Sequence, residues 1–114
     1  MPREITILSS TAHDLYAVAH AAEGIEGAAS VREIDEGAAV QVLSEDGVDL
    51  LTVYAPRRIG TVGEVRRLLP NAPELALPTW WTDAYAPWSE EGEAGVSIAL
   101  RLALAQDAVC LVED

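Results

Sequence analysis

Residues 39–54 read AVQVLSEDGVDLLTVY, and the pattern of this segment is the strongest indication of the class of fold. Two runs rich in aliphatic and β-branched residues, 39–43 and 48–54, flank the turn Ser44-Glu45-Asp46-Gly47. Gly47 can supply the positive φ that a hairpin loop requires. The stretch therefore predicts an antiparallel β-hairpin, so the chain must build a sheet around it.

Upstream of the hairpin, the chain predicts a strand followed by a helix. Residues 4–9 alternate polar and apolar side chains, as a half-buried strand does. In Thr11-Ala12-His13-Asp14, a capping residue is followed three places later by an acid, which is typical of a helix start. Gly24 can end this helix, and a short strand at 30–34 precedes an acidic turn at 35–37. The apolar stripe of the helix contains Leu15, Val18, Ala19 and Ala22.

Downstream of the hairpin, we expect a connector at 56–60, a short helix, an aromatic strand, a long helix and a last strand. Thr61-Val62-Gly63-Glu64 has the spacing of a capping box, and Pro70 ends the short helix. The prolines between 70 and 78 predict an irregular crossing. The remaining elements are a strand at 79–85, a helix at 94–106 with Ser89 as its N-cap, and an interior strand at 108–112.

This order of elements predicts one α+β domain over residues 1–114. We expect a two-layer sandwich with a mixed sheet and with the first and last helices packed on one face. A ferredoxin-like βαββαβ core with extra elements is the leading topology.

The composition excludes several classes of protein. The 114 residues include no Lys and 19 acidic residues against seven Arg, which gives a net charge of −12. Such a chain repels phosphates, so nucleic acid is not an expected partner. No apolar run reaches the roughly 18 residues of a membrane span, and the start lacks the apolar core of a signal peptide, so we expect a cytoplasmic protein. The single Cys110 excludes an internal disulfide and a Cys-rich metal site, and no cofactor is expected.

The residues that could carry catalysis do not form a known constellation. His13 and His20 are seven residues apart, which places them about 10 Å apart on one helix face, too far to bind one metal ion. Cys110 lies in an apolar strand with no neighbouring base. Besides the two hypotheses of binding given below, a third is that the protein is an enzyme that acts through Asp83, through His13 or through a site built by a dimer.

Four of the seven arginines, Arg57, Arg58, Arg66 and Arg67, lie within eleven residues. With the glycines of residues 57–63, Arg57 and Arg58 could form an anion cradle at the start of a helix. Glu64 in the first turn of that helix opposes an anion. The alternative is that these arginines pair with the acidic surface of the protein itself.

Aromatic residues form the second asymmetric group: Trp80, Trp81, Tyr85 and Trp88 are four of the six in the chain. On a strand, Trp80 and Trp81 point to opposite faces. We expect one of them to enter the core beneath the helices. The other is either covered by a loop or exposed as an anchor for a ligand, and Trp81 would share its face with Tyr85.

The absence of Lys, the abundance of Ala, Gly and Arg, and the segment Thr79-Trp80-Trp81-Thr82-Asp83 before an Ala-rich helix support one resemblance. Over residues 79–112 the chain resembles small acidic α/β proteins encoded by high-GC bacteria. The resemblance includes no diagnostic motif and implies no functional residue.

Two hypotheses of function follow. The first is a noncatalytic module that binds a basic protein, as an immunity protein or an inhibitor does, because acid-rich surfaces attract basic partners. The second is a small-molecule-binding domain. In the second, the exposed tryptophan of the pair would form an aromatic wall with Tyr85 and Trp88, and Arg57 and Arg58 would bind an anionic group.

A homodimer is also expected. Along the helix at 94–106, one apolar stripe contains Ile98, Ala99, Leu102 and Ala105, and a second contains Val96, Leu100, Ala103 and Leu104. A single sheet buries only one stripe of a helix. The other stripe must pack on the first helix, lie under a loop or meet a second copy of the chain, and two-fold association is the commonest way to bury surplus apolar surface.

Overall fold

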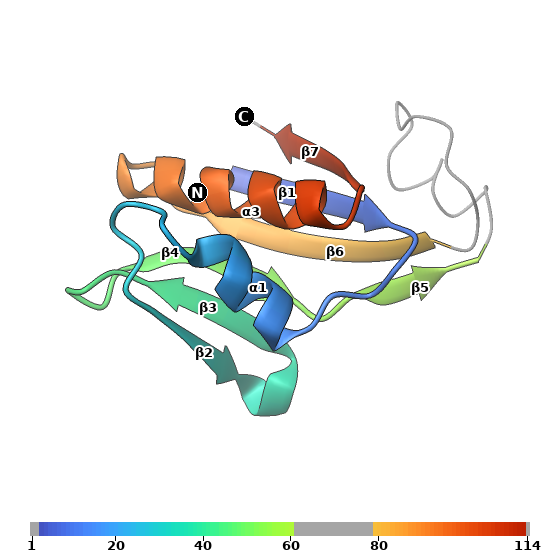
Figure 1. Cartoon of the computed structure of the whole chain (residues 1–114), viewed down its shortest axis with the longest axis horizontal. Helices are drawn as coiled ribbons and strands as arrows, with labels where there is room; N and C mark the ends of the chain where they lie inside the picture. The colour runs from blue at the N-terminus through green and yellow to red at the C-terminus, as the bar shows by residue number, and fades with distance from the viewer. Residues whose placement is uncertain (1–2, 61–78, 114) are drawn as a thin grey trace.

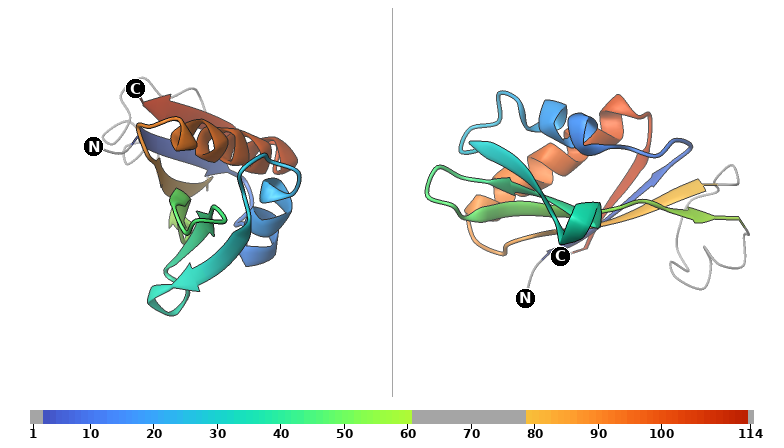
Figure 2. Two further views of the ribbon diagram at one scale, coloured as in Figure 1. Left: turned by 90° about the vertical axis from the view of Figure 1, so that its left-hand side faces the viewer. Right: turned by 90° about the horizontal axis from the view of Figure 1, so that it is seen from below.

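The computed structural model describes residues 3–60 and 79–113. One seven-stranded sheet has both described helices on one face, which confirms an α+β, two-layer arrangement (Figures 1 and 2). The helices are α1 (Leu15–Ala22) and α3 (Glu91–Ala105). The strands are β1 (Arg3–Ser9), β2 (Ser30–Ile34), β3 (Ala39–Leu43), β4 (Asp49–Tyr54), β5 (Arg57–Ile59), β6 (Thr79–Ala86) and β7 (Val109–Glu113), and a 3-10 turn, η1 (Asp35–Gly37), joins β2 to β3.

The strand order is β2-β3-β4-β6-β1-β7, and β5 also pairs with β6. Every pairing between described strands is antiparallel, so the prediction of a mixed sheet is wrong in this respect. The reason is the position of β1. It lies between β6 and β7, the two strands that α3 connects, so these parallel strands do not touch.

The predicted hairpin is confirmed as β3 and β4. Its turn is closed by the backbone N–H of Ser44, which donates to the carbonyl of Val48 at 2.9 Å. The Ser44 hydroxyl in turn accepts from the Val48 N–H at 3.0 Å. Gly47 has a φ of +80°, a backbone conformation that glycine adopts without steric cost.

The predicted connector at 56–60 is wrong, because Arg57–Ile59 forms β5 and continues the line of β4 along β6. Thr52 pairs with Tyr85, and Arg57 pairs with Trp81. Between these two pairs, the β4–β5 segment therefore contains one more residue than β6 does. Pro56 lies at this irregularity. Since proline has no N–H to donate to the ladder, pairing is interrupted there and resumes beyond it.

Both helices begin at residues other than those predicted to cap them. Asp14, not Thr11, caps α1: its carboxylate accepts from the Ala17 N–H at 2.9 Å. At the start of α3 the N-cap residue is Glu90, which makes no capping hydrogen bond through its side chain, and the backbone carbonyl of Ser89 accepts from the Gly92 N–H at 3.0 Å. In both cases an acceptor close to the first turn satisfies free N–H groups.

The main core lies between the sheet and the two helices. Its fully buried members are Ile5, Ile7, Val18, Val42, Leu51, Val53, Ala84, Ala86, Ile98, Ala99 and Leu102. A second cluster, formed by Leu8, Ile59 and Trp81, lies on the opposite face of the sheet. Alternation along β1 explains the division, because Ile7 and Leu8 point to opposite faces.

Contrary to the interior position predicted for the last strand, β7 pairs with β1 alone among the described strands and lies at the edge of the sheet that they form. Helix α3 packs against both the sheet and α1. Ile98, Ala99 and Leu102 of the first predicted stripe are buried, and so is Ala103 of the second. Leu100 is 48% exposed and Leu104 is 81% exposed.

The helix predicted after Thr61, the crossing at 70–78, and Arg66 and Arg67 lie outside the described residues. Within residues 3–60 and 79–113, no helix is long and apolar enough to cross a membrane.

Candidate functional site

The face of the sheet opposite the helices, which we call the open face, carries a row of polar side chains. In this row Gln41 lies opposite Thr52, Thr52 opposite Tyr85, Tyr85 opposite Glu4, and Glu4 opposite Glu113. Cross-strand partners point to the same side of a sheet. The row therefore crosses five strands, and its members alternate with core residues such as Ile5 and Val53.

A pocket of about 530 Å³ lies on this face, at the β4–β6 pairing. The rings of Tyr54 and Tyr85 form one side and meet edge to face, with centroids 5.7 Å apart and planes at 88°. Tyr54 is 42% exposed. The other lining residues are Asp49, Thr52, Ala86 and Pro87. The pocket thus combines an aromatic wall with one carboxylate.

Asp49 is held by a chain of hydrogen bonds from three strands. Its Oδ2 accepts from the Thr52 hydroxyl at 2.5 Å and from Gln41 Nε2 at 3.2 Å, and Arg32 Nε donates to Gln41 Oε1 at 3.0 Å. The second oxygen of Asp49, Oδ1, is buried and has no hydrogen-bond partner among the described residues. A buried acceptor left unpaired is unfavourable, so this carboxylate retains capacity for a donor.

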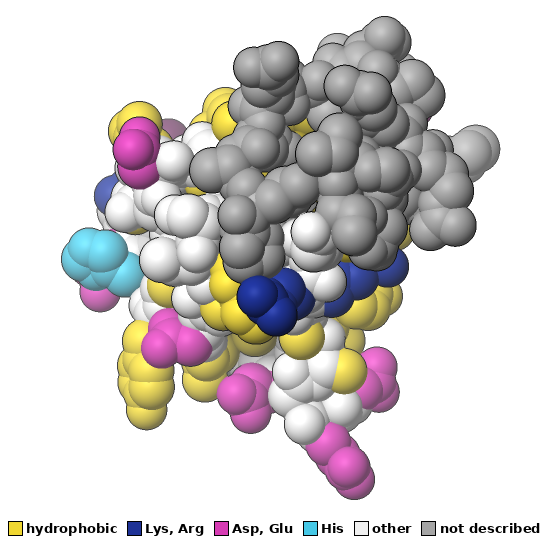
Figure 3. Space-filling model, turned by 90° about the vertical axis from the view of Figure 1, so that its right-hand side faces the viewer, with side chains coloured by type: hydrophobic (Ala, Val, Ile, Leu, Met, Phe, Trp, Pro, Cys, Tyr) yellow, Lys and Arg dark blue, Asp and Glu magenta, His cyan; other side chains and the backbone are white. Residues whose placement is uncertain are grey.

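Arg57, a predicted anion-binding residue, is already engaged. Its guanidinium lies over the ring of Trp81, 5.5 Å from the centroid, and its Nη2 is 3.8 Å from Asp83 Oδ2. Trp81 Nε1 donates to Asp83 Oδ1 at 2.8 Å. These contacts favour the alternative reading, in which the arginine pairs with acidic groups of the protein itself. Figure 3, which faces the β5 end of the sheet, shows basic side chains beside hydrophobic ones.

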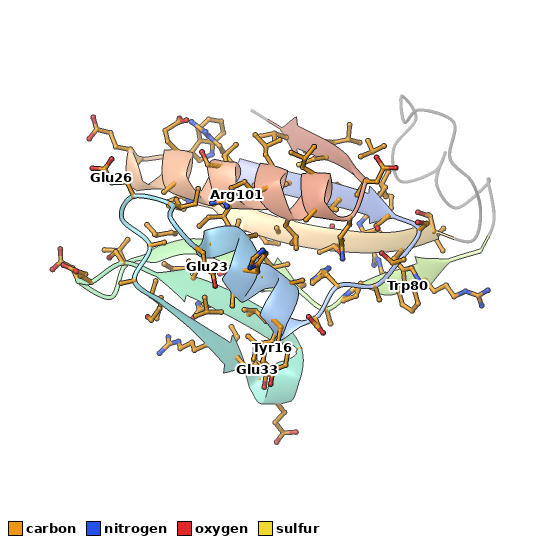
Figure 4. All side chains as sticks on the ribbon, in the orientation of Figure 1. Tyr16, Glu23, Glu26, Glu33, Trp80 and Arg101 are labelled. Atoms are coloured by element: carbon orange, nitrogen blue, oxygen red, sulfur yellow. The ribbon has the colours of Figure 1, made fainter. Side chains whose placement is uncertain are left out.

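The structure also corrects the expected placement of the two adjacent tryptophans. Trp81 points away from the helices, and yet it is the buried one, at 5% exposure, in the second cluster. Trp80 lies on the helix side, near β5, and stays partly exposed (Figure 4). The expectation that the tryptophan facing the helices enters the core is wrong, because Trp80 lies near the start of β6, at the end that the helices do not cover (Figure 1).

The predicted site residues are therefore divided between different places. Arg57, Trp81 and Tyr85 share the open face, whereas Arg58 pairs with Trp80 on the other face. Trp88 lies beyond the end of β6, where the guanidinium of Arg3 is 5.1 Å from its ring centroid. Asp49, Thr52 and Tyr54 were not predicted as site residues. Thr52 and Tyr54 alternate with the apolar Leu51 and Val53, a pattern that could have placed Thr52 and Tyr54 on one face.

Glu4 and Glu113 are adjacent carboxylates on β1 and β7, at the end of the polar row. A hydrogen bond with Glu113 and then repulsion from its charge raise the pKa of Glu4 above its ordinary value, with smaller effects from burial and from Asp83. The folded chain consequently binds a proton at Glu4 more readily than the unfolded chain does.

This pair predicts a dependence of stability on pH. The protonated Glu4 stabilises the fold fully below the ordinary glutamate pKa, and this contribution is lost as the pH rises through the raised value. We expect Glu4→Gln to raise the melting temperature at neutral pH and to leave it unchanged in acid. Thermal unfolding across a pH series measures this, with the exposed Glu26→Gln as control. An equal shift in both variants at every pH would contradict the assignment.

The histidines do not converge. His13 is half-buried, with Nδ1 3.4 Å from the Thr82 hydroxyl, and its burial lowers its pKa, an effect that Asp14 partly offsets. A pocket of about 210 Å³ lies beside it and also contacts Glu33 and Tyr54. His20 is at the surface, 3.3 Å from Glu23.

Cys110 is half-buried, and burial raises the pKa of its thiol, so it is not activated as a nucleophile. Within the described part of the chain, no group of three or more His, Cys, Asp or Glu side chains could hold a metal ion.

Comparison of the chain with models of protein families finds no match, and no curated protein and no solved structure is significantly similar to it.

Proposed function

We propose that this chain is a noncatalytic binding protein, of the immunity or inhibitor type, whose open face receives a cationic side chain of a basic protein partner. The observation that carries the proposal is the pocket in which Tyr54 and Tyr85 stand beside Asp49, whose Oδ1 lacks a donor. A guanidinium or ammonium group supplies N–H donors and a positive charge in one ligand.

The surroundings of the pocket favour a cation over an anion. Tyr85 lies directly opposite Glu4 and two residues from Asp83 on the same face, and Glu113 follows Glu4 in the row. Aromatic rings attract cations, and such contacts strengthen when water is excluded. The net charge of −12 would add long-range attraction of a basic partner.

The alternative, a small-molecule site for an anionic group, has less support. Arg57 is paired with Asp83 and stacked on Trp81, so an incoming anion would have to compete with a carboxylate of the protein. Trp81 is buried and offers no exposed ring. An enzyme has less support still, because His13 contacts Thr82, on the face of β6 opposite to that of Tyr85.

We further propose that the fold is a ferredoxin-like core enlarged by one hairpin. The order β1, α1, β4, β6, α3, β7 along the chain and the order β4-β6-β1-β7 across the sheet support this, with β2 and β3 inserted after α1. This topology by itself indicates no activity, because such a fold hosts many functions. Binding is inferred from the pocket and the charges around it, and not from the topology.

A hexa-arginine peptide tests the cation site. We expect calorimetry at low salt to detect binding and Tyr85→Ala to weaken it by about 10- to 100-fold, the range for losing an aromatic anchor. Asp49→Asn keeps the shape of the pocket and should also weaken binding. Tyr16→Ala is the matched control, because Tyr16 is a 79% exposed tyrosine on α1.

Circular dichroism would verify that each variant is folded. If Tyr85→Ala and Tyr16→Ala bind the peptide as tightly as the original chain does, only diffuse charge attraction is present and the pocket is excluded. A neutral peptide of equal length should not bind. Capture of basic proteins from the native lysate by the original chain, and not by Tyr85→Ala, would then identify the partner.

A further inference from the structure

We infer that two copies of this chain pair through β7, antiparallel to each other, about a two-fold axis at Leu111, so that their sheets continue into one another. The inference is independent of the proposed function. It rests on the edge strand, on the self-complementarity of its residues and on the exposed flank of α3.

The edge strand has the properties of a strand that accepts a partner. β7 pairs with β1 on one side, and no described strand lies on its other side (Figure 1). Natural edge strands are usually protected by a charge, a proline or a bulge. Residues 109–112, Val-Cys-Leu-Val, contain neither a charge nor a proline, and the pairing of β7 with β1 has no irregularity.

A two-fold axis at Leu111 is the arrangement that pairs all five residues of β7 with their counterparts. Leu111 then faces the partner's Leu111, Cys110 faces Val112, and Val109 faces Glu113. The single acid of β7 thus lies opposite an aliphatic residue rather than another acid. This matters because like charges directly opposite one another destabilise a pair of strands.

The flank of α3 extends the apolar surface beside this edge. Arg101 donates to the backbone carbonyl of Glu23, just after α1, and so marks the side of α3 that faces α1. Leu100 lies about 100° from Arg101 around the helix, away from α1, whereas Leu104 lies between these two directions on the outer side of the helix. Below them, Cys110 and Val112 are half-buried on the helix side of β7, because their partners in β1 are Ile7 and Ile5.

The negative charge of the chain opposes association of two copies except through an uncharged surface. Each copy carries a net charge of −12, so acidic surfaces of two copies repel one another. Leu100, Cys110 and Val112 carry no charge, and strand hydrogen bonds add to apolar burial. The dimer should therefore persist in high salt, unlike binding to a basic partner.

Cross-linking tests the register. In the pairing at Leu111, Val112→Cys places its thiol directly opposite Cys110 of the other copy, with Cβ atoms roughly 4.5–5.5 Å apart. We expect mild oxidation to give a covalent dimer in which position 112 of one copy is joined to Cys110 of the other. The original chain should link poorly, because its two Cys110 residues are diagonal neighbours roughly 7–8 Å apart. Ser97→Cys, exposed on α3, is the control and should not increase linking.

Light scattering over a concentration series tests the dimer itself. We expect a mass twice 12.2 kDa for the original chain. Leu100→Glu should raise the dimer dissociation constant at least about tenfold, which is the effect of roughly 1.4 kcal/mol. Tyr16→Glu, an equally polar change at an exposed residue of α1, should leave the mass unchanged. A mass of 12.2 kDa at every concentration would overturn the proposal, as would a dimer that Leu100→Glu does not weaken or that Ser97→Cys cross-links as well as Val112→Cys.

Discussion

Gly95→Ala will destabilise the protein, although in the middle of an exposed helix the same change ordinarily stabilises it by about 0.5–1 kcal/mol. A Cβ at Gly95 would lie 1.9 Å from the carbonyl oxygen of Leu50 and 3.0 Å from the Cβ of Ala86. The obstacle is the backbone of β4, which cannot move aside as a flexible side chain can. Helix α3 would have to lift from the sheet.

The expected loss is at least about 3 kcal/mol, the upper part of the range for overpacking, because Ile98, Ala99 and Leu102 would lose contact with the sheet together. Urea denaturation followed by circular dichroism measures it. Ser97→Ala, two residues away and exposed, is the control, and we expect it to raise stability slightly. A midpoint for Gly95→Ala equal to or above that of the original chain would show that α3 does not approach β4 so closely.

Trp81→Ala will lower the free energy of unfolding by about 3–5 kcal/mol, the range for removing a large buried aromatic side chain. Trp81 is 5% exposed and packs with Leu8 and Ile59 on the open face of the sheet. Its removal also takes away the hydrogen bond to Asp83 and the ring beneath Arg57.

The matched control is Trp88→Ala, since Trp88 is 47% exposed and its ring contacts the guanidinium of Arg3. We expect it to change the free energy of unfolding by less than about 1 kcal/mol, as exposed substitutions usually do. Chemical denaturation of the three chains, side by side, gives the comparison. Equal losses in the two variants would mean that the second cluster contributes no more to stability than an exposed ring does.

The residues of the candidate site were harder to predict than the elements that carry them. Tyr85 was selected because aromatic residues gather in 80–88, and the pocket includes it. Its neighbours Tyr54 and Asp49 come from β4, more than thirty residues earlier, and meet Tyr85 only because β4 pairs with β6. Strand pairing over such a separation leaves no local signal in the sequence.

Elements whose sequence signals are local could be predicted without the structure. The hairpin at 39–54, the strand–helix start and the aromatic strand followed by the Ala-rich helix all rest on side-chain period and turn residues. Chain alternation also determined that Trp80 and Trp81 occupy opposite faces, and that Trp81 shares a face with Tyr85.

Which side chains are buried on each face, and which strand forms an edge, depend on contacts between elements that are far apart in the chain. The alternation of side chains along a strand predicts that Trp80 and Trp81 point to opposite faces. Their burial depends on how far the helices extend along the sheet, and the helices do not cover Trp80 (Figures 1 and 4). An apolar strand such as 109–112 is read as interior because interior strands are apolar. Its place beyond β1 follows instead from the crossover of α3, a long-range geometry that no window of the sequence contains.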